Sequence, residues 1–131
     1  DGVDDSLVVR PTVLSGASND MPAACNEHFG PIAPVIPFSD VDEAVEMAND
    51  TEYGLTGSVH AGDIGTGLQI AKRIDSGNIH VNDQGINDEA HVPFSGTKAS
   101  GLGGYNSDDF LDEVTEKKWI SLQHEPREYP F

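Results

Sequence analysis

The chain has 131 residues, 37% of them hydrophobic and one of them a cysteine, so it suits one modest domain and excludes an internal disulfide or a thiolate metal cluster. Its 23 Asp and Glu residues against 7 Lys and Arg give a formal charge of −16, which makes nucleic acid and anionic membranes poor partners. No apolar run approaches the roughly 20 residues of a membrane span, and the acidic start DGVDD is unlike a signal peptide, so we expect a soluble, cytoplasmic protein.

Strand-like and helix-like patterns alternate through the first two thirds of the chain. Runs rich in β-branched and aliphatic residues predict strands over 7–14, 32–38, 55–61 and 78–82. Apolar residues at helical spacing predict helices over 41–49 and 64–74. Asp40 and Glu43 stand at capping-box spacing for the first helix, and Gly77 is a natural residue to close the second. This order indicates an α/β fold of parallel βαβ units with right-handed crossovers.

The last third of the chain is less regular. Residues 83–106 form a glycine-rich stretch with little periodicity, and loops of that length are usually functional. Ser107 is placed to cap a short acidic helix over 108–114, and a final strand is expected over 117–122, around Trp119. An edge strand followed by an aromatic tail predicts a partner chain.

Five stretches carry a family resemblance, in the same order as in the family: RPTVL, NEHFGPIAPVIPF, ANDTEYGLTGSV, PFSGTKASGLG and VTEKKWISL. Together they resemble the C-terminal part of the aldehyde dehydrogenase superfamily. The stretches NDQGINDEAHVPF and REYPF look like the branch that acts on benzaldehyde, salicylaldehyde or vanillin. The resemblance implies part of an aldehyde dehydrogenase catalytic domain over 1–106, followed over 107–131 by a short helix, an oligomerisation strand and a tail.

The resemblance also implies an activity. The family oxidises aldehydes to acids with NAD or NADP, using a nucleophilic cysteine and a general-base glutamate. In the family both residues lie upstream of the matched region, so we expect no catalytic residue here and an inactive chain when it stands alone. The alternative is a non-catalytic interaction module that keeps the family's oligomerisation strand. Either reading predicts a homo-oligomer, or association with a missing N-terminal part, through the strand around Trp119.

Cys25 is the obvious candidate for a nucleophile. A reactive thiolate needs a helix N-terminus or a cation nearby, whereas Cys25 precedes Asn26 and Glu27, with His28 as the one neighbour that can become cationic. An acidic neighbour disfavours the thiolate. We therefore expect Cys25 to be a structural or incidental cysteine. A hydrolase dyad of Cys25 and His28 is a poor alternative, because it lacks an orienting group and an oxyanion hole.

Glu27 and Phe29 are the candidate cofactor-binding residues. Spacing alone favours a solvated acid and a core phenylalanine at these positions. The resemblance implies instead that Glu27 accepts hydrogen bonds from the hydroxyls of the nicotinamide ribose and that Phe29 packs beside that ribose. Gly30 and Pro31 are expected to turn the backbone away after them, and Asn26 stands where the family often has a second acid.

The loop from Asn82 to Phe94 is the candidate substrate wall. By resemblance Phe94 lines the aldehyde pocket, while residues near Asp83, with Gln84 and Ile86, shape its mouth. A place in the hydrophobic core is the alternative role for Phe94, with the same weight as the pocket role. A metal site at residues 88, 89 and 91 is the weaker interpretation, because such small clusters arise by chance in so acidic a chain.

Two substitutions depart from the family in the PFSGTKASGLGG stretch. Ser95 replaces a usual glycine, where a positive φ would strain it, and Gly104 replaces an arginine that would anchor the following helix. Lys98 and Ser100 match the family, but nothing supplies the other elements of a Ser–Lys nucleophilic site.

The acidic residues are spread along the chain and interleave with apolar ones, which is typical of a solvated acidic surface rather than of disorder. High salt screens the self-repulsion of such a surface within a few ångströms. A halophilic source is therefore a reasonable expectation.

Overall fold

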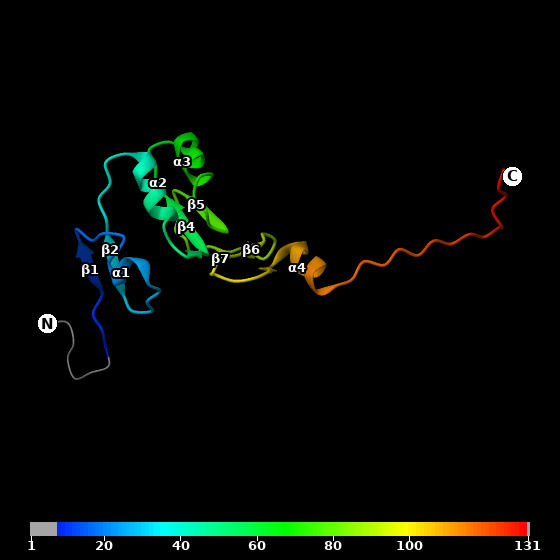
Figure 1. The fold of residues 1–131 in the computed structure, drawn as a ribbon, viewed down its shortest axis with the longest axis horizontal. Coiled ribbons are helices and arrows are strands. Elements are labelled where there is room, and N and C mark those ends of the chain that lie inside the picture. The colour runs from blue at the N-terminus through cyan, green and yellow to red at the C-terminus, as the bar shows by residue number, and fades with distance from the viewer. Residues whose placement is uncertain (1–7, 131) are drawn as a thin grey trace.

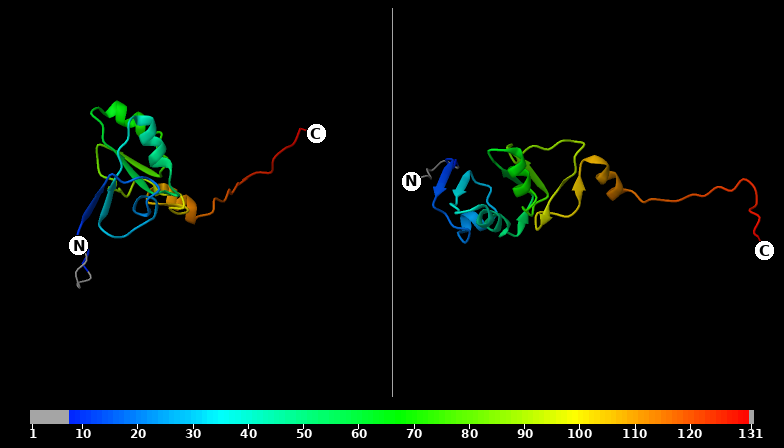
Figure 2. Two further views of the ribbon diagram at one scale, coloured as in Figure 1. Left: turned by 60° about the vertical axis from the view of Figure 1, so that its left-hand side comes forward. Right: turned by 90° about the horizontal axis from the view of Figure 1, so that it is seen from above.

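The computed structural model describes residues 8–130, which form a folded part followed by an extended C-terminal tail (Figures 1 and 2). The elements in chain order are β1 (Thr12–Ser15), α1 (Pro22–Cys25), β2 (Ile32–Val35), α2 (Val41–Asn49), β3 (Tyr53–Gly54), β4 (Thr56–Val59), α3 (Ile64–Ala71), β5 (Asn78–Val81), β6 (Phe94–Ser95), β7 (Thr97–Lys98), β8 (Gly104–Tyr105) and α4 (Ser107–Val114). The α/β class predicted from the sequence is confirmed. The first residue of the strand predicted over 7–14 lies outside the described residues.

Two pairs of parallel strands form the framework. β1 pairs with β2, with Thr12 opposite Ile32, and β4 pairs with β5, with Thr56 opposite Asn78. α3 connects β4 to β5, and α2 links the two pairs along the chain (Figure 1). The parallel pairing is as predicted, but β2 and β4 are not hydrogen-bonded to each other, so the four strands form two separate sheets.

Short side chains at the helix ends explain where the two main helices begin. Asp40 Oδ1 accepts a hydrogen bond from the backbone N–H of Glu43 at 2.9 Å, and Glu43 Oε2 accepts one from the N–H of Ser39 at 2.6 Å, which confirms the predicted cap of α2. Asp63 caps α3 in the same way, because its Oδ1 accepts from the N–H of Thr66 at 2.9 Å.

Gly77 does not end a helix, contrary to the sequence prediction. α3 ends at Ala71 with Lys72 as its C-cap, so Gly77 lies six residues beyond that helix, directly before β5. The absence of a side chain at Gly77 serves a different purpose, since a Cβ atom there would lie 1.7 Å from the backbone oxygen of Ser95. Gly77 is therefore a point of close approach between two backbones.

The stretch 83–106 contains strands that the sequence did not predict. β6 pairs antiparallel with β8, and β7 pairs antiparallel with β3, each through two residues. Only the part from Asn82 to Pro93 remains a loop between β5 and β6. Pairs this short are set by tertiary contacts and leave no period in the sequence.

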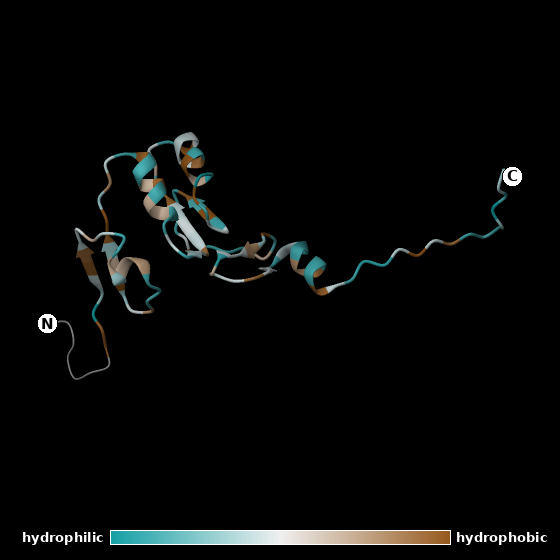
Figure 3. Ribbon diagram, in the orientation of Figure 1, coloured by the Kyte–Doolittle hydropathy of each residue, from teal (hydrophilic) through white to brown (hydrophobic). Residues whose placement is uncertain are grey.

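The described residues bury little apolar surface of their own. Ala17 and Val45, each 6% exposed, are the buried apolar side chains among them. Phe29, Leu102 and Trp119 are 96%, 97% and 92% exposed, and hydrophobic residues occur along the strands and helices of the folded part in Figure 3. Parallel sheets normally have both faces covered, whereas the described residues leave these apolar side chains exposed. No helix within residues 8–130 is long and apolar enough to cross a membrane.

The C-terminal region differs from the prediction in two respects. α4 forms over Ser107–Val114, so the predicted helix is present but begins one residue earlier, with Asn106 rather than Ser107 as its N-cap; Ser107 Oγ, at the first helical position, accepts a hydrogen bond from the N–H of Asp109 at 3.2 Å. The strand expected over 117–122 is not formed, because a strand needs a partner and these residues pair with no other described segment. The tail instead runs away from the folded part in all three ribbon views (Figures 1 and 2).

Candidate functional site

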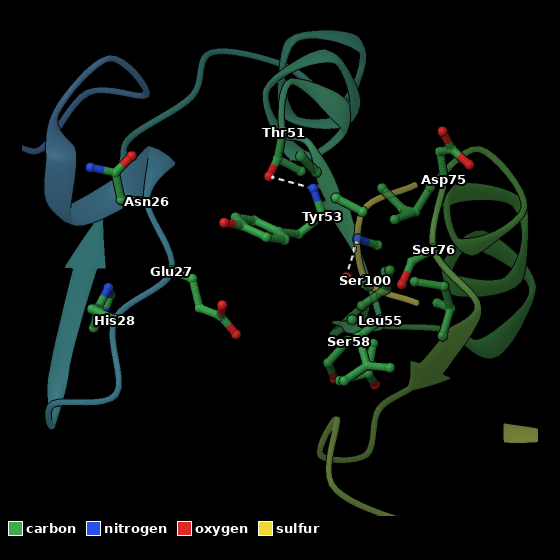
Figure 4. Close-up of a pocket in the computed structure, with 18 residues that line it drawn as sticks. Asn26, Glu27, His28, Thr51, Tyr53, Leu55, Ser58, Asp75, Ser76 and Ser100 are labelled. Atoms are coloured by element: carbon green, nitrogen blue, oxygen red, sulfur yellow. Dashed lines mark hydrogen bonds between the residues drawn. The ribbon is translucent and has the colours of Figure 1, made fainter. Parts of the chain in front are cut away.

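A pocket of about 580 Å³ lies between the segment that precedes β2 and the β4–β5 pair. Glu27 comes from the connection between α1 and β2, and its carboxylate points into this space (Figure 4). The opposite wall consists of β3 and β4, with Tyr53 and Leu55 among the residues that line it. Segments about 26 residues apart in sequence thus face one another across one pocket.

The backbone after Glu27 explains its position. Gly30 and Pro31 turn the chain, with the N–H of Ile32 donating to the backbone oxygen of Gly30 at 2.8 Å. The backbone oxygen of Pro31 then accepts from the N–H of Thr12 at 2.9 Å, which starts the β1–β2 ladder. The predicted turn therefore leaves Glu27 at the end of the sheet while β2 continues away from it.

Tyr53, in the wall of this pocket, has a raised pKa. The negative charge of Glu52 raises the pKa of Tyr53 most, followed by loss of solvent, a hydrogen bond to Glu52 and the charge of Glu27. Both carboxylates therefore disfavour ionisation of the phenol. Tyr53 was not predicted as a site residue from the sequence, although an aromatic side chain with a polar tip among turn residues is a recognisable signal.

Phe29 is not brought into the pocket with Glu27. Its side chain is 96% exposed, and Phe29 lines neither this pocket nor the one beside the loop between β5 and β6. An exposed ring is available to pack against a bound group, so the role of Phe29 stays a prediction.

Cys25 and His28 do not face one another as a catalytic pair. Cys25 Sγ lies 4.0 Å from the backbone oxygen of Asp20 and 3.7 Å from Oδ1 of Asn26, whereas His28 Nε2 lies 3.0 Å from the backbone oxygen of Ile32. Cys25 is also the last residue of α1, so the helix presents no N-terminal N–H groups to its thiol.

The loop between β5 and β6 borders a second pocket, of about 400 Å³. Phe94 is half-buried and lines it, whereas Gln84 and Ile86 lie outside its lining, with Ile86 86% exposed. Asp83 anchors the loop by accepting hydrogen bonds from the N–H of Gln84 and from the Asn87 side chain. The same bonds lower the pKa of the Asp83 carboxyl; burial raises that pKa, and the charges of two nearby histidines lower it further.

Acidic and histidine side chains of the same loop form only a weak contact. His91 Nε2 lies 3.4 Å from Oε2 of Glu89, and both side chains are exposed. No group of three or more His, Cys, Asp or Glu side chains within residues 8–130 is placed to hold a metal ion.

Lys98 and Ser100 join separate parts of the fold rather than each other. Lys98 Nζ donates to the backbone oxygens of Asn49 at 3.0 Å and Thr51 at 3.2 Å, at the end of α2. Ser100 Oγ accepts from the N–H of Gly54 at 2.9 Å. Both residues fasten the segment after β6 to the wall of the first pocket, which the sequence did not reveal.

The two departures from the family pattern are accommodated. Ser95 does not have a positive φ, so the strain expected there is absent, and it pairs with Gly104 in the β6–β8 ladder. The N–H of Gly104 donates to Oε2 of Glu113 at 3.0 Å. This charge-assisted bond anchors α4, and it supplies the kind of anchor whose loss was expected with the missing arginine.

Comparison with known proteins gives a consistent result. The model of the aldehyde dehydrogenase family matches residues 1–120. A benzaldehyde dehydrogenase of Bacillus subtilis (strain 168) is 48% identical over 127 residues, which cover 97% of this chain and 26% of that protein. The chain thus spans about a quarter of the length of the curated relatives it matches.

Solved structures show the same correspondence. The structure of a salicylaldehyde dehydrogenase from Pseudomonas putida G7, complexed with salicylaldehyde, matches with a TM-score of 0.85 and 36% identity over 95% of this chain and 26% of that one. An aldehyde dehydrogenase of Mycobacterium tuberculosis, complexed with NAD+, matches with a TM-score of 0.83 and 33% identity over 89% of this chain and 25% of that one.

Proposed function

The chain belongs to the aldehyde dehydrogenase family, and on this basis we propose that it forms the C-terminal part of an enzyme that oxidises an aldehyde to its carboxylic acid with NAD or NADP. The observation that carries the proposal is the placement of the Glu27 carboxylate in the pocket between the two parallel strand pairs. The cofactor, when bound, accepts the hydride that leaves the aldehyde.

The pocket around Glu27 suits a ribose. A carboxylate offers two oxygens that can accept hydrogen bonds from neighbouring hydroxyls. No lysine or arginine is among the described residues that line this pocket, so its chemistry favours a neutral hydroxyl-bearing group over a phosphate. Glu27 would hold the nicotinamide ribose, and Phe29, with its exposed ring, would pack beside it.

The substrate we propose is an aromatic aldehyde. Relatives with 48% and 46% identity are benzaldehyde dehydrogenases, and one of 40% identity is a vanillin dehydrogenase. Phe94 would form an apolar part of the pocket, with Gln84 and Ile86 at its mouth. An apolar wall excludes water from the reacting carbon and favours a flat ring over a charged substrate.

The nucleophilic cysteine and the general-base glutamate belong, in this proposal, to sequence outside these residues. The position of Cys25 at the end of α1 supports this, because it lacks a neighbouring base or cation. The separate β1–β2 and β4–β5 pairs support it as well, since each has an unpaired edge that a further strand of the same enzyme would complete.

Association through the tail is the second element of the proposal. Trp119, Ile120 and Leu122 are 92%, 70% and 78% exposed, and three large apolar side chains on an unpaired extended segment favour pairing with another chain. A non-catalytic oligomerisation module would use the same segment. We place the assembled enzyme in the cytoplasm, and the charge of −16 favours a salt-rich one.

Glu27→Gln in the native polypeptide that contains these residues tests the proposal. The substitution removes the charge from the ribose contact while keeping the size of the side chain. Charge-assisted hydrogen bonds contribute about 1.5–3 kcal/mol, so the KM for NAD should rise roughly tenfold or more. Glu46→Gln, at an exposed glutamate on α2, is the matched control. Equal NAD dependence of the two variants would contradict the assignment of Glu27.

A further inference from the structure

Two hydroxyl side chains of β4 hold the loop that follows β5. Thr56 and Ser58 are two residues apart in β4 and therefore point to the same face of the strand. Thr56 Oγ1 donates to the backbone oxygen of Gly85 at 2.7 Å, and Ser58 Oγ donates to the backbone oxygen of Asp83. The two hydroxyl groups, which are two residues apart in β4, thus bind two carbonyl groups that are two residues apart in the loop.

The loop fits closely against these hydroxyls. A Cβ atom on Gly85 would lie 3.3 Å from Thr56 Oγ1, tighter than nearly all real Cβ contacts, so the glycine permits the approach. Asp83 closes the turn internally, because its Oδ1 accepts from the N–H of Gln84 at 2.8 Å and its Oδ2 from Nδ2 of Asn87 at 2.9 Å. The segment 83–87 is therefore shaped by Asp83 and positioned by β4.

A third residue fixes the direction of the hydrogen bonds. His60 Nε2 lies 3.2 Å from Ser58 Oγ. A serine hydroxyl has one proton, and here it goes to the backbone oxygen of Asp83, which can only accept. Nε2 of His60 must consequently donate to Ser58, so His60 carries a proton on Nε2 when the contact is formed.

We propose that His60, Ser58 and Thr56 form a relay of positioning residues that sets the place of the substrate wall and thereby the discrimination between aldehydes. The proposal rests on the proposed function, in which Gln84 and Ile86 of this loop shape the mouth of the aldehyde pocket. None of the three relay residues contacts the substrate in this account. They act through the loop backbone, which Thr56 and Ser58 hold by hydrogen bonds from β4.

The test compares Ser58→Ala, Ser58→Thr and Thr56→Val in the native polypeptide, with Ser39→Ala as control, since the Ser39 hydroxyl has no hydrogen bond among the described contacts. The readout is kcat/KM for benzaldehyde and for vanillin, together with the KM for NAD. Each lost hydrogen bond should lower aldehyde kcat/KM roughly two- to tenfold, mainly through KM, and change the ratio between the two aldehydes. Ser58→Thr should restore the ratio, whereas a change in the KM for NAD with no change in the aldehyde ratio would make Thr56 and Ser58 residues of the first pocket, which they also line, and would contradict the relay.

Two further measurements separate the possible failures. If Gln84→Ala and Ile86→Ala leave the ratio of kcat/KM between the two aldehydes unchanged, the assignment of this loop as the substrate wall is wrong, and the relay proposal is wrong with it. If those variants change the ratio but Ser58→Ala does not, the relay alone is wrong. Should Ser58→Ala fail to fold, nitrogen NMR of the wild-type protein decides, with His60→Gln used to assign the signal. A proton on Nε2 of His60 is expected, and an imidazole protonated only on Nδ1 would overturn the relay.

Discussion

Gly77→Ala perturbs the junction at which the residue before β5 meets the end of β6. A Cβ atom at this position would lie 1.7 Å from the backbone oxygen of Ser95 and 2.7 Å from its carbonyl carbon, whereas ordinary van der Waals contact begins at 3.4 Å. The distance to the oxygen would have to double before the methyl group fits. The obstacle is backbone, which cannot move aside as a flexible side chain can.

The cost follows from the contacts that the methyl group would break. Overpacking of this kind costs about 1–3 kcal/mol, and a backbone obstacle places this substitution near the upper end. The same oxygen of Ser95 accepts a hydrogen bond from Nδ2 of Asn78 at 3.0 Å, which adds about 1 kcal/mol if it is lost. We therefore expect Gly77→Ala to lower the free energy of unfolding by about 3–4 kcal/mol.

Denaturant unfolding of the purified native polypeptide measures the effect. Gly62→Ala is the matched control, because a Cβ atom there meets nothing within 4 Å and its φ lies outside the left-handed region. The control should stay within about 1 kcal/mol of the wild type. Because β6 contains Phe94, Gly77→Ala should also raise the KM for the aldehyde. Equal unfolding midpoints for the two alanine variants would refute the close approach between Gly77 and Ser95.

Three other predictions address the helix cap, the cysteine and the aldehyde pocket. Hydrogen bonding to Thr66 lowers the pKa of Asp63 below its ordinary value of 3.8, so the cap stabilises the fold above about pH 4 and this contribution disappears as the pH falls through the folded-state pKa. Asp63→Asn should accordingly lower the unfolding midpoint at neutral pH and match the wild type in strong acid; a constant difference at all pH values would argue against the ionised cap. Cys25→Ser should change aldehyde oxidation less than about twofold, since its thiol lacks an activating neighbour, and a complete loss of turnover would restore Cys25 as a nucleophile. Phe94→Ala should raise the KM for benzaldehyde about tenfold, as expected for the loss of apolar contact between the ring and the substrate, without changing the KM for NAD; an unchanged aldehyde KM would make Phe94 a residue outside the pocket.

Local patterns were sufficient to predict the main framework. The β-branched and aliphatic runs located β1, β2, β4 and β5, and the helical spacing after Asp40 located α2 with its observed bounds. The cap of α2 depends on residues three apart, which a sequence displays directly. Alternation of strands and helices then gave the parallel pairing.

The features that the sequence did not reveal depend on contacts between distant segments. β3 pairs with β7 through Tyr53 and Lys98, 45 positions apart, and neither two-residue strand has a period of its own. The use of Gly77 is visible only once Ser95 lies against it, so the glycine was assigned to a helix end instead. The strand expected around Trp119 has a suitable composition but requires a partner that the described residues do not supply.

The residues of the candidate site also differ in whether a local sequence pattern or a contact between distant segments sets their position. The EHFGP motif located Glu27 at the end of the sheet by resemblance, and the structure places its carboxylate in a pocket. Tyr53 and Ser100 were not predicted on the opposite wall, because their place there depends on long-range contacts such as the β3–β7 pairing and the bond between Gly54 and Ser100. Gln84 and Ile86 lie on a loop whose position is set by hydroxyls of β4, a relation that no local pattern encodes.

The most direct test of the central claim is turnover by the native polypeptide that contains these residues, purified from its source and mixed with NAD or NADP and benzaldehyde. The reduced cofactor and the carboxylic acid would be quantified together. Our account predicts equal amounts of both products and a sharply reduced rate at limiting cofactor for Glu27→Gln. A folded protein that forms neither product with benzaldehyde, vanillin or salicylaldehyde, while still associating through its tail, would contradict aldehyde oxidation and favour an interaction module.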